Sequence, residues 1–444
     1  MNTLFRFFTA VDAFLWSYAI FILIVLAGLY LTFRSRFYQF RVLEHLPSAL
    51  KKMMKDSQKE SVGVSPFRLF FTTSGGKIGI GNSVAVVTAI TVGGPGALFW
   101  LWIAAMSGML IKYAEIYLGM HYRRHNAKQD GYNGSLMFSF SDAFGSHWGR
   151  ILMKIGGVFL CIYGVEVYQF TILTDTVQKI VPIHRDVIIV GVLLLTLYIA
   201  MGGVRRLANF CSTLAPAFLV AYVGMCLWIL FCNAGALPGI VTSVFKSAFV
   251  GHAPLGGFVG SGVFIAIQKG MARAVYSGDI AIGFDSIIQS ESKLQQPQHQ
   301  ARMAIVSTFS DTMICTLTSL VILVTGLWQT GGLQDSEYMQ KAMGLYFPYS
   351  EYLMEGIILL ACLTTIQSYF VVGAKSATFV SRRWGQILFF CYAIVAFVFF
   401  AHFDQSQVIL VMSLSGGILV LINLSCMLRL RKKVTFSKKM QDDI

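Results

Sequence analysis

The sequence predicts an all-α polytopic membrane protein, in which one transmembrane helix precedes two repeats of five helices with opposite orientation. The first observation is composition: 56% of the 444 residues are hydrophobic and 13% are charged, whereas a soluble domain carries about 25% charged residues. The second is that the apolar residues fall into about eleven blocks of membrane-spanning character. The third is that two of these blocks, at matching places in the two halves, are interrupted by glycine.

Most of the blocks approach the length of about 20 residues that a helix needs to cross the hydrocarbon core. In chain order they cover residues 13–33, 66–91, 97–120, 151–178, 187–202, 211–233, 257–290, 303–327, 352–374, 386–402 and 407–428. Between the first two, residues 37–55 place Phe37, Phe40 and Leu43 at helical spacing beside basic side chains. This pattern predicts an amphipathic helix that lies in the membrane interface.

The basic residues of the connecting loops predict the orientation. The loops at 34–65, 121–150, 203–210, 291–302, 375–385 and 429–444 hold 24 Lys and Arg residues, and the alternate loops hold 5. Because cytoplasmic loops carry the excess of Lys and Arg, we expect the N-terminus outside and the C-terminus inside. We expect the chain in the cell inner (cytoplasmic) membrane.

The two interrupted blocks predict a binding site. Gly75, Gly76, Gly79 and Gly81 break the second block, and Gly256, Gly257, Gly260 and Gly262 begin the seventh. Each opens a run of five blocks, and the two runs enter the membrane from opposite sides. Glycine also serves close helix packing. Two interrupted segments at matched positions of inverted halves favour the solute site of a secondary transporter, because unwound backbone at that depth must bind something.

These blocks divide the chain into four parts. Residues 1–65 hold the first span and the interfacial helix, 66–254 and 255–428 hold the two repeats, and 429–444 form a basic cytoplasmic tail. Since Lys and Arg lie mainly in short loops, we expect no nucleic-acid partner. We expect no catalytic residue, metal site or cofactor, because no metal-ligand or nucleophile–base spacing occurs. The alternative from another class of protein is an ion channel. The sequence contains no repeat that resembles a selectivity filter, which disfavours this alternative.

Several motifs resemble the alanine/glycine:cation symporter family, the sodium:alanine symporters. They are Gly-Gly-Pro-Gly-Ala-Leu-Phe-Trp at 93–100, the segment 65–82, Lys-Tyr-Ala-Glu at 112–115 and Gly-Gly-Val-Arg-Arg-Leu-Ala at 202–208. The resemblance covers about residues 15–428. It implies a leucine-transporter-like core of five plus five inverted helices preceded by one extra helix, and import of alanine or glycine coupled to a cation such as sodium.

The resemblance also implies which residues bind the substrate. Gly79, Gly81 and Asn82 correspond to the unwound stretch of the first core helix, and Gln169 to the family's substrate-facing glutamine. The chain departs from the family pattern at Lys77, which replaces a small or hydroxyl residue, and at Glu166, where the family has Gly-Asn. Asp279 replaces a glutamate and Tyr369 a tryptophan, so Tyr369 is expected to reshape the pocket wall.

Lys77 has two interpretations. Charges inside spans are rare and usually functional, so its ammonium could replace the sodium ion, carry a proton, or abolish ion coupling and change the substrate. Alternatively, it snorkels to the cytoplasmic face. Glu166, three residues before Gln169 and on the same helical face, is expected to pair with Lys77, to bind the substrate's amine, or to pair structurally.

The remaining candidates concern charge and sodium. Asp279 keeps the charge of the family glutamate, and Arg273 is expected to pair with Asp279 or with Glu115. Thr364 and Thr365 correspond to hydroxyls that help to ligate sodium in this fold, although threonine also serves helix packing. The sequence therefore predicts a symporter that imports a small neutral amino acid with sodium; the alternative is proton coupling or no ion coupling through Lys77.

Overall fold

The computed structural model describes residues 2–48, 51, 54, 62–79, 81–82, 86–126, 131–250, 259–329, 333, 335–402 and 406–436. The N-terminal half contains α1 (Asn2–Phe14), η1 (Leu15–Ala19), α2 (Ile20–Arg34), α3 (Tyr38–Glu44), α5 (Pro66–Lys77), α6 (Val86–Gly93), α7 (Gly96–His121), β1 (Arg124–Asn126), β2 (Gly131–Asn133), η3 (Leu136–Ser139), α8 (Phe140–Phe144), α9 (Ser146–Tyr163), α10 (Val167–Ile180), α11 (Arg185–Met201) and α12 (Gly203–Cys232). The C-terminal half contains η4 (Ala234–Ala236), α13 (Leu237–Val250), α14 (Val259–Ser277), α15 (Phe284–Gln289), α16 (Pro297–Val324), η5 (Leu327–Gln329), α17 (Asp335–Gly344), α18 (Ser350–Val380), α19 (Gly385–Phe400) and α20 (Ser406–Arg429).

The all-α class predicted from the sequence is confirmed. Within the described ranges, six helices are long and apolar enough to cross a membrane, or seven when the bent pair α2–α3 counts as one span. The predicted number of eleven spans therefore stays a prediction. The strands found in this part of the chain are β1 and β2, a three-residue antiparallel pair.

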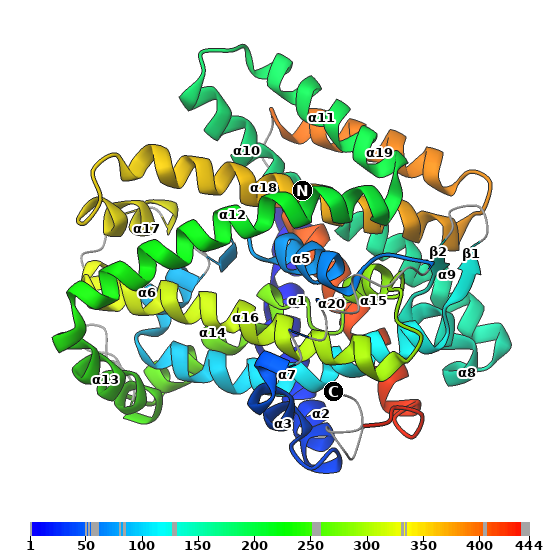
Figure 1. The fold of residues 1–444 in the computed structure, drawn as a ribbon, viewed down its shortest axis with the longest axis horizontal. Helices are drawn as coiled ribbons and strands as arrows, with labels where there is room; N and C mark the ends of the chain where they lie inside the picture. The colour runs from blue at the N-terminus through cyan, green and yellow to red at the C-terminus, as the bar shows by residue number, and fades with distance from the viewer. Residues whose placement is uncertain are drawn as a thin grey trace.

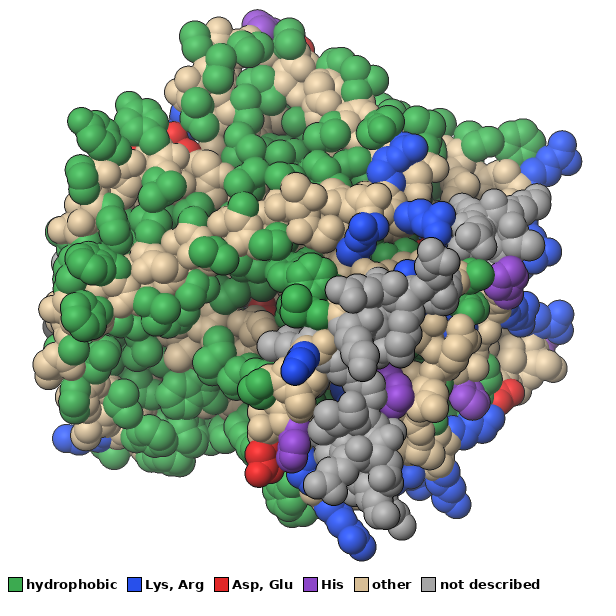
Figure 2. Space-filling model, viewed as in Figure 1, with side chains coloured by type: hydrophobic (Ala, Val, Ile, Leu, Met, Phe, Trp, Pro, Cys, Tyr) green, Lys and Arg blue, Asp and Glu red, His purple; other side chains and the backbone are tan. Residues whose placement is uncertain are grey.

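The long helices α7, α12, α14, α16 and α18 run in roughly one direction through the molecule (Figure 1). Helix α7 packs against α2, α14 and α16 and is mostly buried, which agrees with a helix that is apolar on all sides. Helices α13 and α17 lie at one end, and β1, β2 and α8 lie at the other. On the face drawn in Figure 2, Lys and Arg side chains gather at the end with the strands.

The first interrupted span forms α5 and α6. Helix α5 begins where Ser65 accepts a hydrogen bond from the backbone N–H of Arg68 at 3.3 Å and Pro66 occupies the first helical position, a favourable helix start. It ends at Lys77. The described residues 78–79 are bends outside any helix, and α6 begins at Val86.

The second interrupted span forms α14 and α15, but the predicted place of its break is wrong. Gly260 and Gly262 lie inside α14, and Gly256 and Gly257 fall outside the described residues. The break follows Ser277 instead, where Asp279 and Ala281 have φ of 47° and 64°. Left-handed backbone of this kind costs energy for residues other than glycine. The amide of Asn423 on α20 stabilises it by donating to the Ala281 carbonyl at 2.9 Å.

The span predicted at residues 151–178 is present as the apolar span Ser146–Ile180, which is interrupted at one place. Helices α9 and α10 are separated at residues 164–166. A Cβ atom at Gly164 would lie 2.8 Å from the Cα of Gly373 on α18. The two glycines therefore let the backbones of α9 and α18 approach closely beside this break.

Two helices lie in segments that were predicted as loops between spans, residues 234–256 and 328–351. Helix α13 is apolar but shorter than a span, and α17 precedes α18. The predicted interfacial helix at 37–55 is represented by α3, and most residues beyond 48 fall outside the described part.

Candidate functional site

The unwound stretch after α5 lies against α10 and α18. A Cβ atom at Gly79 would be 2.9 Å from Oγ1 of Thr365 and 3.0 Å from Oε1 of Gln169. The structure thus brings together three of the residues predicted for substrate and cation binding. Oε1 of Gln169 is buried and has no hydrogen-bond partner among the described residues, which leaves an acceptor beside Gly79.

Two threonine hydroxyls face the last turn of α5. Oγ1 of Thr364 lies 2.9 Å from the Gly75 carbonyl oxygen, and Oγ1 of Thr365 lies 3.5 Å from it. Both hydroxyls also reach the Ala361 carbonyl of their own helix at 3.0 Å. Carbonyl and hydroxyl oxygens at the negative end of a half-helix are suitable ligands for a monovalent cation.

The other side of the unwound stretch carries a polar network. The Asn82 amide donates to Asp311 at 2.6 Å and accepts from Arg273 at 3.2 Å. Ser277 donates to the second oxygen of Asp311 at 3.0 Å. Arg273 also lies within 3.4 Å of a Cβ built at Gly81. The prediction that Arg273 pairs with Asp279 or Glu115 is therefore wrong, because its guanidinium faces Asn82.

Asp279 connects the break between α14 and α15 to two other spans. Its carboxylate accepts hydrogen bonds from Tyr163 on α9 at 2.9 Å and from Tyr369 on α18. Tyr369 stacks on Phe284, with ring centroids 4.5 Å apart. Tyr369 is therefore buried, with its hydroxyl bound to Asp279, and it is not among the residues that line the cavity beside Gly79.

Lys77 does not pair with Glu166, contrary to prediction. Its ammonium donates to Oδ2 of Asp285 on α15 at 2.7 Å and lies 3.4 Å from Oγ of Ser307. Lys112 on α7 binds the same Asp285 oxygen at 2.7 Å and also donates to the Asp279 carbonyl at 2.8 Å. The snorkelling interpretation of Lys77 is wrong as well, because its side chain is only 2% exposed.

Glu166 lies in the break before α10 and is 7% exposed. Its carboxylate shows no hydrogen bond or ion pair to the residues that the structure describes. Glu166 immediately precedes α10, which begins at Val167 and contains Gln169. Glu166 is therefore at the boundary of the helix on which it was predicted to share a face with Gln169.

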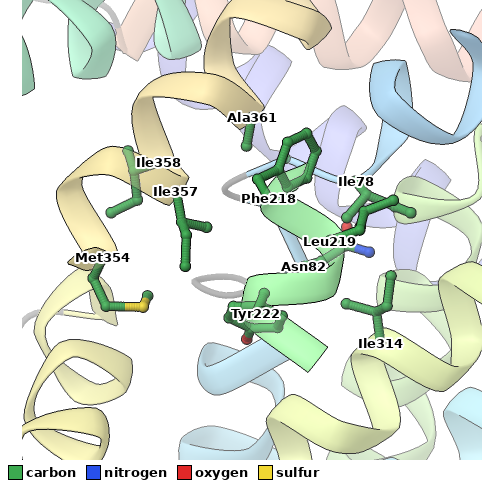
Figure 3. A pocket seen from close by; sticks show the side chains of 11 residues that line it. Ile78, Asn82, Phe218, Leu219, Tyr222, Ile314, Met354, Ile357, Ile358 and Ala361 are labelled. Atoms are coloured by element: carbon green, nitrogen blue, oxygen red, sulfur yellow. The ribbon is translucent and has the colours of Figure 1, made fainter. Parts of the chain in front are cut away.

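An apolar cavity opens beside Gly79 and Asn82 (Figure 3). About 380 Å³ of space, part of it open to solvent, lies between α12, α16 and α18, and the part that a water-sized group can enter is about 20 Å³. Its walls are mainly aliphatic and aromatic side chains: Ile78, Phe218, Leu219, Tyr222, Ile314, Met354, Ile357, Ile358 and Ala361. A space of this size next to the polar backbone at Gly79 holds about one water-sized group, such as a methyl group.

Contacts between separate segments close the end with the strands. Val64 donates to the Glu291 carbonyl at 2.8 Å, and Lys293 donates back to Val64 at 3.0 Å. Glu291 forms an ion pair with Lys375 of α18. Arg123 donates to the Ser292 carbonyl at 2.7 Å, and its burial lowers its pKa. These contacts hold the segment after α15 against the start of α5.

The sequence analysis overlooked Asp285 and Lys112. Both are charged residues inside apolar blocks, so the rule that selected Lys77 would have found them too. Among the described residues, no group of three His, Cys, Asp or Glu side chains is arranged to hold a metal ion.

Comparisons with known proteins identify the family of the chain. The model of the "Sodium:alanine symporter family" matches residues 1–442. An uncharacterized transporter of Haemophilus influenzae is 31% identical over 430 residues, covering 96% of this chain and 93% of that protein. The sodium/alanine symporter AgcS of Methanococcus maripaludis is 31% identical over 337 residues, covering 73% of this chain and 72% of that protein. The probable sodium/glutamine symporter GlnT of Bacillus subtilis is 25% identical, covering 95% and 87%.

Two solved structures share the fold. A Na⁺-coupled sialic acid symporter in a substrate-bound outward-open state superposes with a TM-score of 0.52, 13% identity, and coverage of 91% of this chain and 82% of that chain. Mhp1, a nucleobase-cation-symport-1 family transporter in a closed conformation, superposes with a TM-score of 0.51 and 14% identity, and the match covers 78% of this chain and 74% of that chain. The predicted leucine-transporter-like fold class is therefore confirmed.

Proposed function

The chain belongs to the sodium:alanine symporter family, and from this premise we propose that it imports a small neutral amino acid, such as alanine or glycine, together with sodium. That it is a cation-coupled amino-acid symporter and a multi-pass membrane protein follows from the family. The observation that carries the proposal is the meeting of Gly79, Gln169 and Thr365 in one place.

The geometry around Gly79 supports a small substrate. The unwound backbone and the free Oε1 of Gln169 are suited to the charged amino-acid main chain. The small apolar space beside it is suited to a side chain no larger than a methyl group. GlnT is named for glutamine, so substrates differ within the family, and the identity of this substrate rests on the uptake experiment below.

The two faces of α5 support sodium as the coupled ion. A Cβ atom at Gly75 would meet Ala215 at 3.0 Å and Thr364 at 3.6 Å, so this face points to α12 and α18. Lys77 is two residues later, about 200° around the helix, and its ammonium binds Asp285. The lysine is thus held away from the threonine hydroxyls. This disfavours the alternative in which Lys77 replaces the ion.

The proposed transport cycle uses the closed contacts at the end with the strands. We take this end as cytoplasmic because basic loops gather there, with the N-terminus outside. Substrate and sodium bind at the breaks, and the helices that carry the breaks then rock against the others. Release to the cytoplasm requires the contacts of Glu291 with Lys375 to open.

Radiolabelled uptake into proteoliposomes tests the proposal. We expect alanine or glycine uptake that follows an imposed sodium gradient, with no uptake driven by a proton gradient alone. Replacing Thr364 and Thr365 with Val should raise the sodium concentration for half-maximal uptake by about tenfold, which equals about 1.4 kcal/mol. Thr174→Val is the matched control, because that buried hydroxyl donates only to the Thr171 carbonyl. Proton-driven uptake, or no response of sodium dependence to the double change, would overturn sodium coupling here.

A further inference from the structure

Residues 430–436, which follow α20, form a segment that packs against the rest of the protein. Residues 430–433 form a turn, and residues 434–436 lie outside any helix or strand. Leu430 and Val434 are nevertheless only 7% and 2% exposed, and both pack into a hydrophobic core. The segment is therefore held on the protein and does not project from it.

The ring of Phe436 is held by tyrosines from two elements. It stacks on Tyr113 of α7 with ring centroids 5.1 Å apart, and its centroid lies 5.5 Å from that of Tyr38 on α3. Tyr38 and Tyr113 also contact each other, with centroids 5.4 Å apart, and both are fully buried. Aromatic pairs at such distances attract each other beyond the effect of burial alone. Phe436 is therefore the anchor of this segment.

Thr435 joins α7 to the start of α16. The Tyr113 hydroxyl donates to the Thr435 carbonyl at 2.8 Å, and the Tyr117 hydroxyl lies 3.0 Å from the Thr435 hydroxyl. Gln298, in the first turn of α16, donates to the same Thr435 hydroxyl at 3.1 Å. Neutral hydrogen bonds of this kind have a small net effect on stability. Thr435 therefore holds the two helices by contacts that can break and form again.

The beginning of the segment is attached to a different group of helices. Arg429, the last residue of α20, donates to the Ala143 carbonyl of α8 at 3.2 Å, and Lys433 forms an ion pair with Asp142 of α8 at 2.6 Å. Both α8 and α20 pack mainly against α9. Helix α8 lies at the end with the strands (Figure 1). At this end, residues 430–436 therefore connect α8, α9 and α20 to α7 and α16.

The segment also holds the elements that close this end. The residues after α15, which carry the ion pair of Glu291 with Lys375, run directly into α16. Arg123, which follows α7, donates to the Ser292 carbonyl at 2.7 Å. The closing residues are thus attached to the end of α7 and to the start of α16, and Thr435 binds both helices. Movement of the closing residues would strain the contacts of Thr435.

We propose that residues 430–436 form a strap that holds the cytoplasmic end closed, and that Phe436 must leave the rings of Tyr38 and Tyr113 before this end opens. The strap joins two groups of helices that separate at this end when one group rocks against the other. The inference rests on the alternating-access cycle of the proposed function. It goes beyond that function, because it assigns control of the release step to residues outside the substrate site.

Labelling of a cysteine placed by Ser65→Cys tests the strap without substrate or sodium. Ser65 is 9% exposed and directly precedes α5, so a polar maleimide reaches it only when the cytoplasmic end opens. The full chain is used in detergent, with the exposed Cys232 and Cys391 changed to serine. The rate of labelling then measures how often this end is open.

Two variants weaken the strap at different contacts. Phe436→Ala should raise the labelling rate by about tenfold, because both aromatic contacts are lost. Thr435→Val should raise it by about fivefold, because the hydroxyl contacts with Gln298 and Tyr117 are lost, and it gives the same test if Phe436→Ala does not fold. Lys432→Ala is the matched control: Lys432 is exposed in the same segment, and its loss should change the rate by less than about twofold.

A second cysteine distinguishes opening of one end from general loosening. Ser247→Cys places it at a buried position of α13, at the opposite end of the molecule (Figure 1). Release of the strap should not accelerate labelling there. Equal acceleration at Ser65 and Ser247 would overturn the proposal, because the variants would then only loosen the protein. An unchanged rate at Ser65 in both strap variants would overturn it as well.

The strap and the proposed function can fail separately. Faster labelling at Ser65 in Phe436→Ala, in a protein that takes up neither alanine nor glycine, would keep the strap and reject the proposed substrates. Sodium-driven uptake together with unchanged labelling would keep the proposed function and reject the strap.

Discussion

Replacing Asp285 with Asn should destabilise the protein more than replacing Lys77. Both ammonium groups, those of Lys77 and Lys112, lie 2.7 Å from the same oxygen of Asp285, and the three side chains are 0–2% exposed. Asp285→Asn would leave two buried ammonium groups around a neutral amide. Removing one partner of a buried pair costs about 3–5 kcal/mol, and here a single substitution unpairs two cations.

Lys77→Met has a smaller expected cost. Asp285 would keep its contact with Lys112 at 2.7 Å, and the methionine would fill most of the lysine's volume. We expect a loss of about 1–3 kcal/mol, the range for one lost partner in a hydrogen-bonded site. The double variant Lys77→Met with Asp285→Asn should recover stability relative to Asp285→Asn alone, because one of the two unpaired cations is gone.

Equilibrium unfolding in mixed detergent micelles measures these differences. The expected order of unfolding free energy is wild type, then Lys77→Met, then the double variant, then Asp285→Asn. Lys433→Met, which removes an exposed ion pair with Asp142, is the matched control and should leave the unfolding free energy close to that of the wild type, because solvent screens exposed ion pairs. A cost for Asp285→Asn equal to or below that of Lys77→Met would refute the shared-carboxylate argument.

Three further predictions concern other parts of the molecule. Gly79→Ala should lower substrate affinity by about 10- to 100-fold while the protein stays folded, because the new methyl group would lie 2.9–3.0 Å from Thr365 and Gln169. Uptake kinetics of the variant measure this affinity. An unchanged affinity would contradict the assignment of the substrate site to Gly79. Glu291→Gln should favour the cytoplasm-open state, because it breaks the ion pair with Lys375. A cysteine placed at Ser65 should then react faster with a polar maleimide. An unchanged reaction rate would contradict the proposal that this ion pair must open for release. The hydrogen bond from Lys433 lowers the pKa of Asp142, so this contact stabilises the folded state above the unfolded pKa of about 3.9, and its contribution is lost as pH falls through the lower folded value. Asp142→Asn should therefore reduce the pH dependence of the unfolding free energy between about pH 5 and 2. An unchanged pH dependence would count against this contact.

The sequence predicts the membrane class and two interrupted spans because both follow from local composition. Apolar block length identifies helices, and glycine and polar residues mark the unwound stretch at Gly79. The break between α14 and α15 was misplaced because its cause is not local. Asp279 and Ala281 take left-handed backbone that is stabilised by Asn423, about 140 residues later in the chain. The residues at the break therefore do not reveal which distant segment stabilises it.

The candidate site shows the same limit. Gln169 and Thr365 lie beside Gly79 in the structure, and the resemblance to a family identified them in advance. The partners of the charged residues could not be predicted in this way, because pairing depends on which helices meet. Lys77, Arg273 and Glu166 were all assigned partners that the structure does not give them. Charge inside a span marks a residue as important without naming its neighbour.

The placement of the two kinds of ion pair agrees with an alternating-access cycle. Lys77, Lys112 and Asp285 come from α5, α7 and α15, and α7 packs against both α14 and α15, so these elements can move as one body. A fully buried pair is costly to separate, so a pair that had to open in every cycle would slow transport. Glu291 and Lys375 are 11–13% exposed and join the segment after α15 to α18. Water can replace this contact as it opens, so it is the pair suited to break when substrate is released.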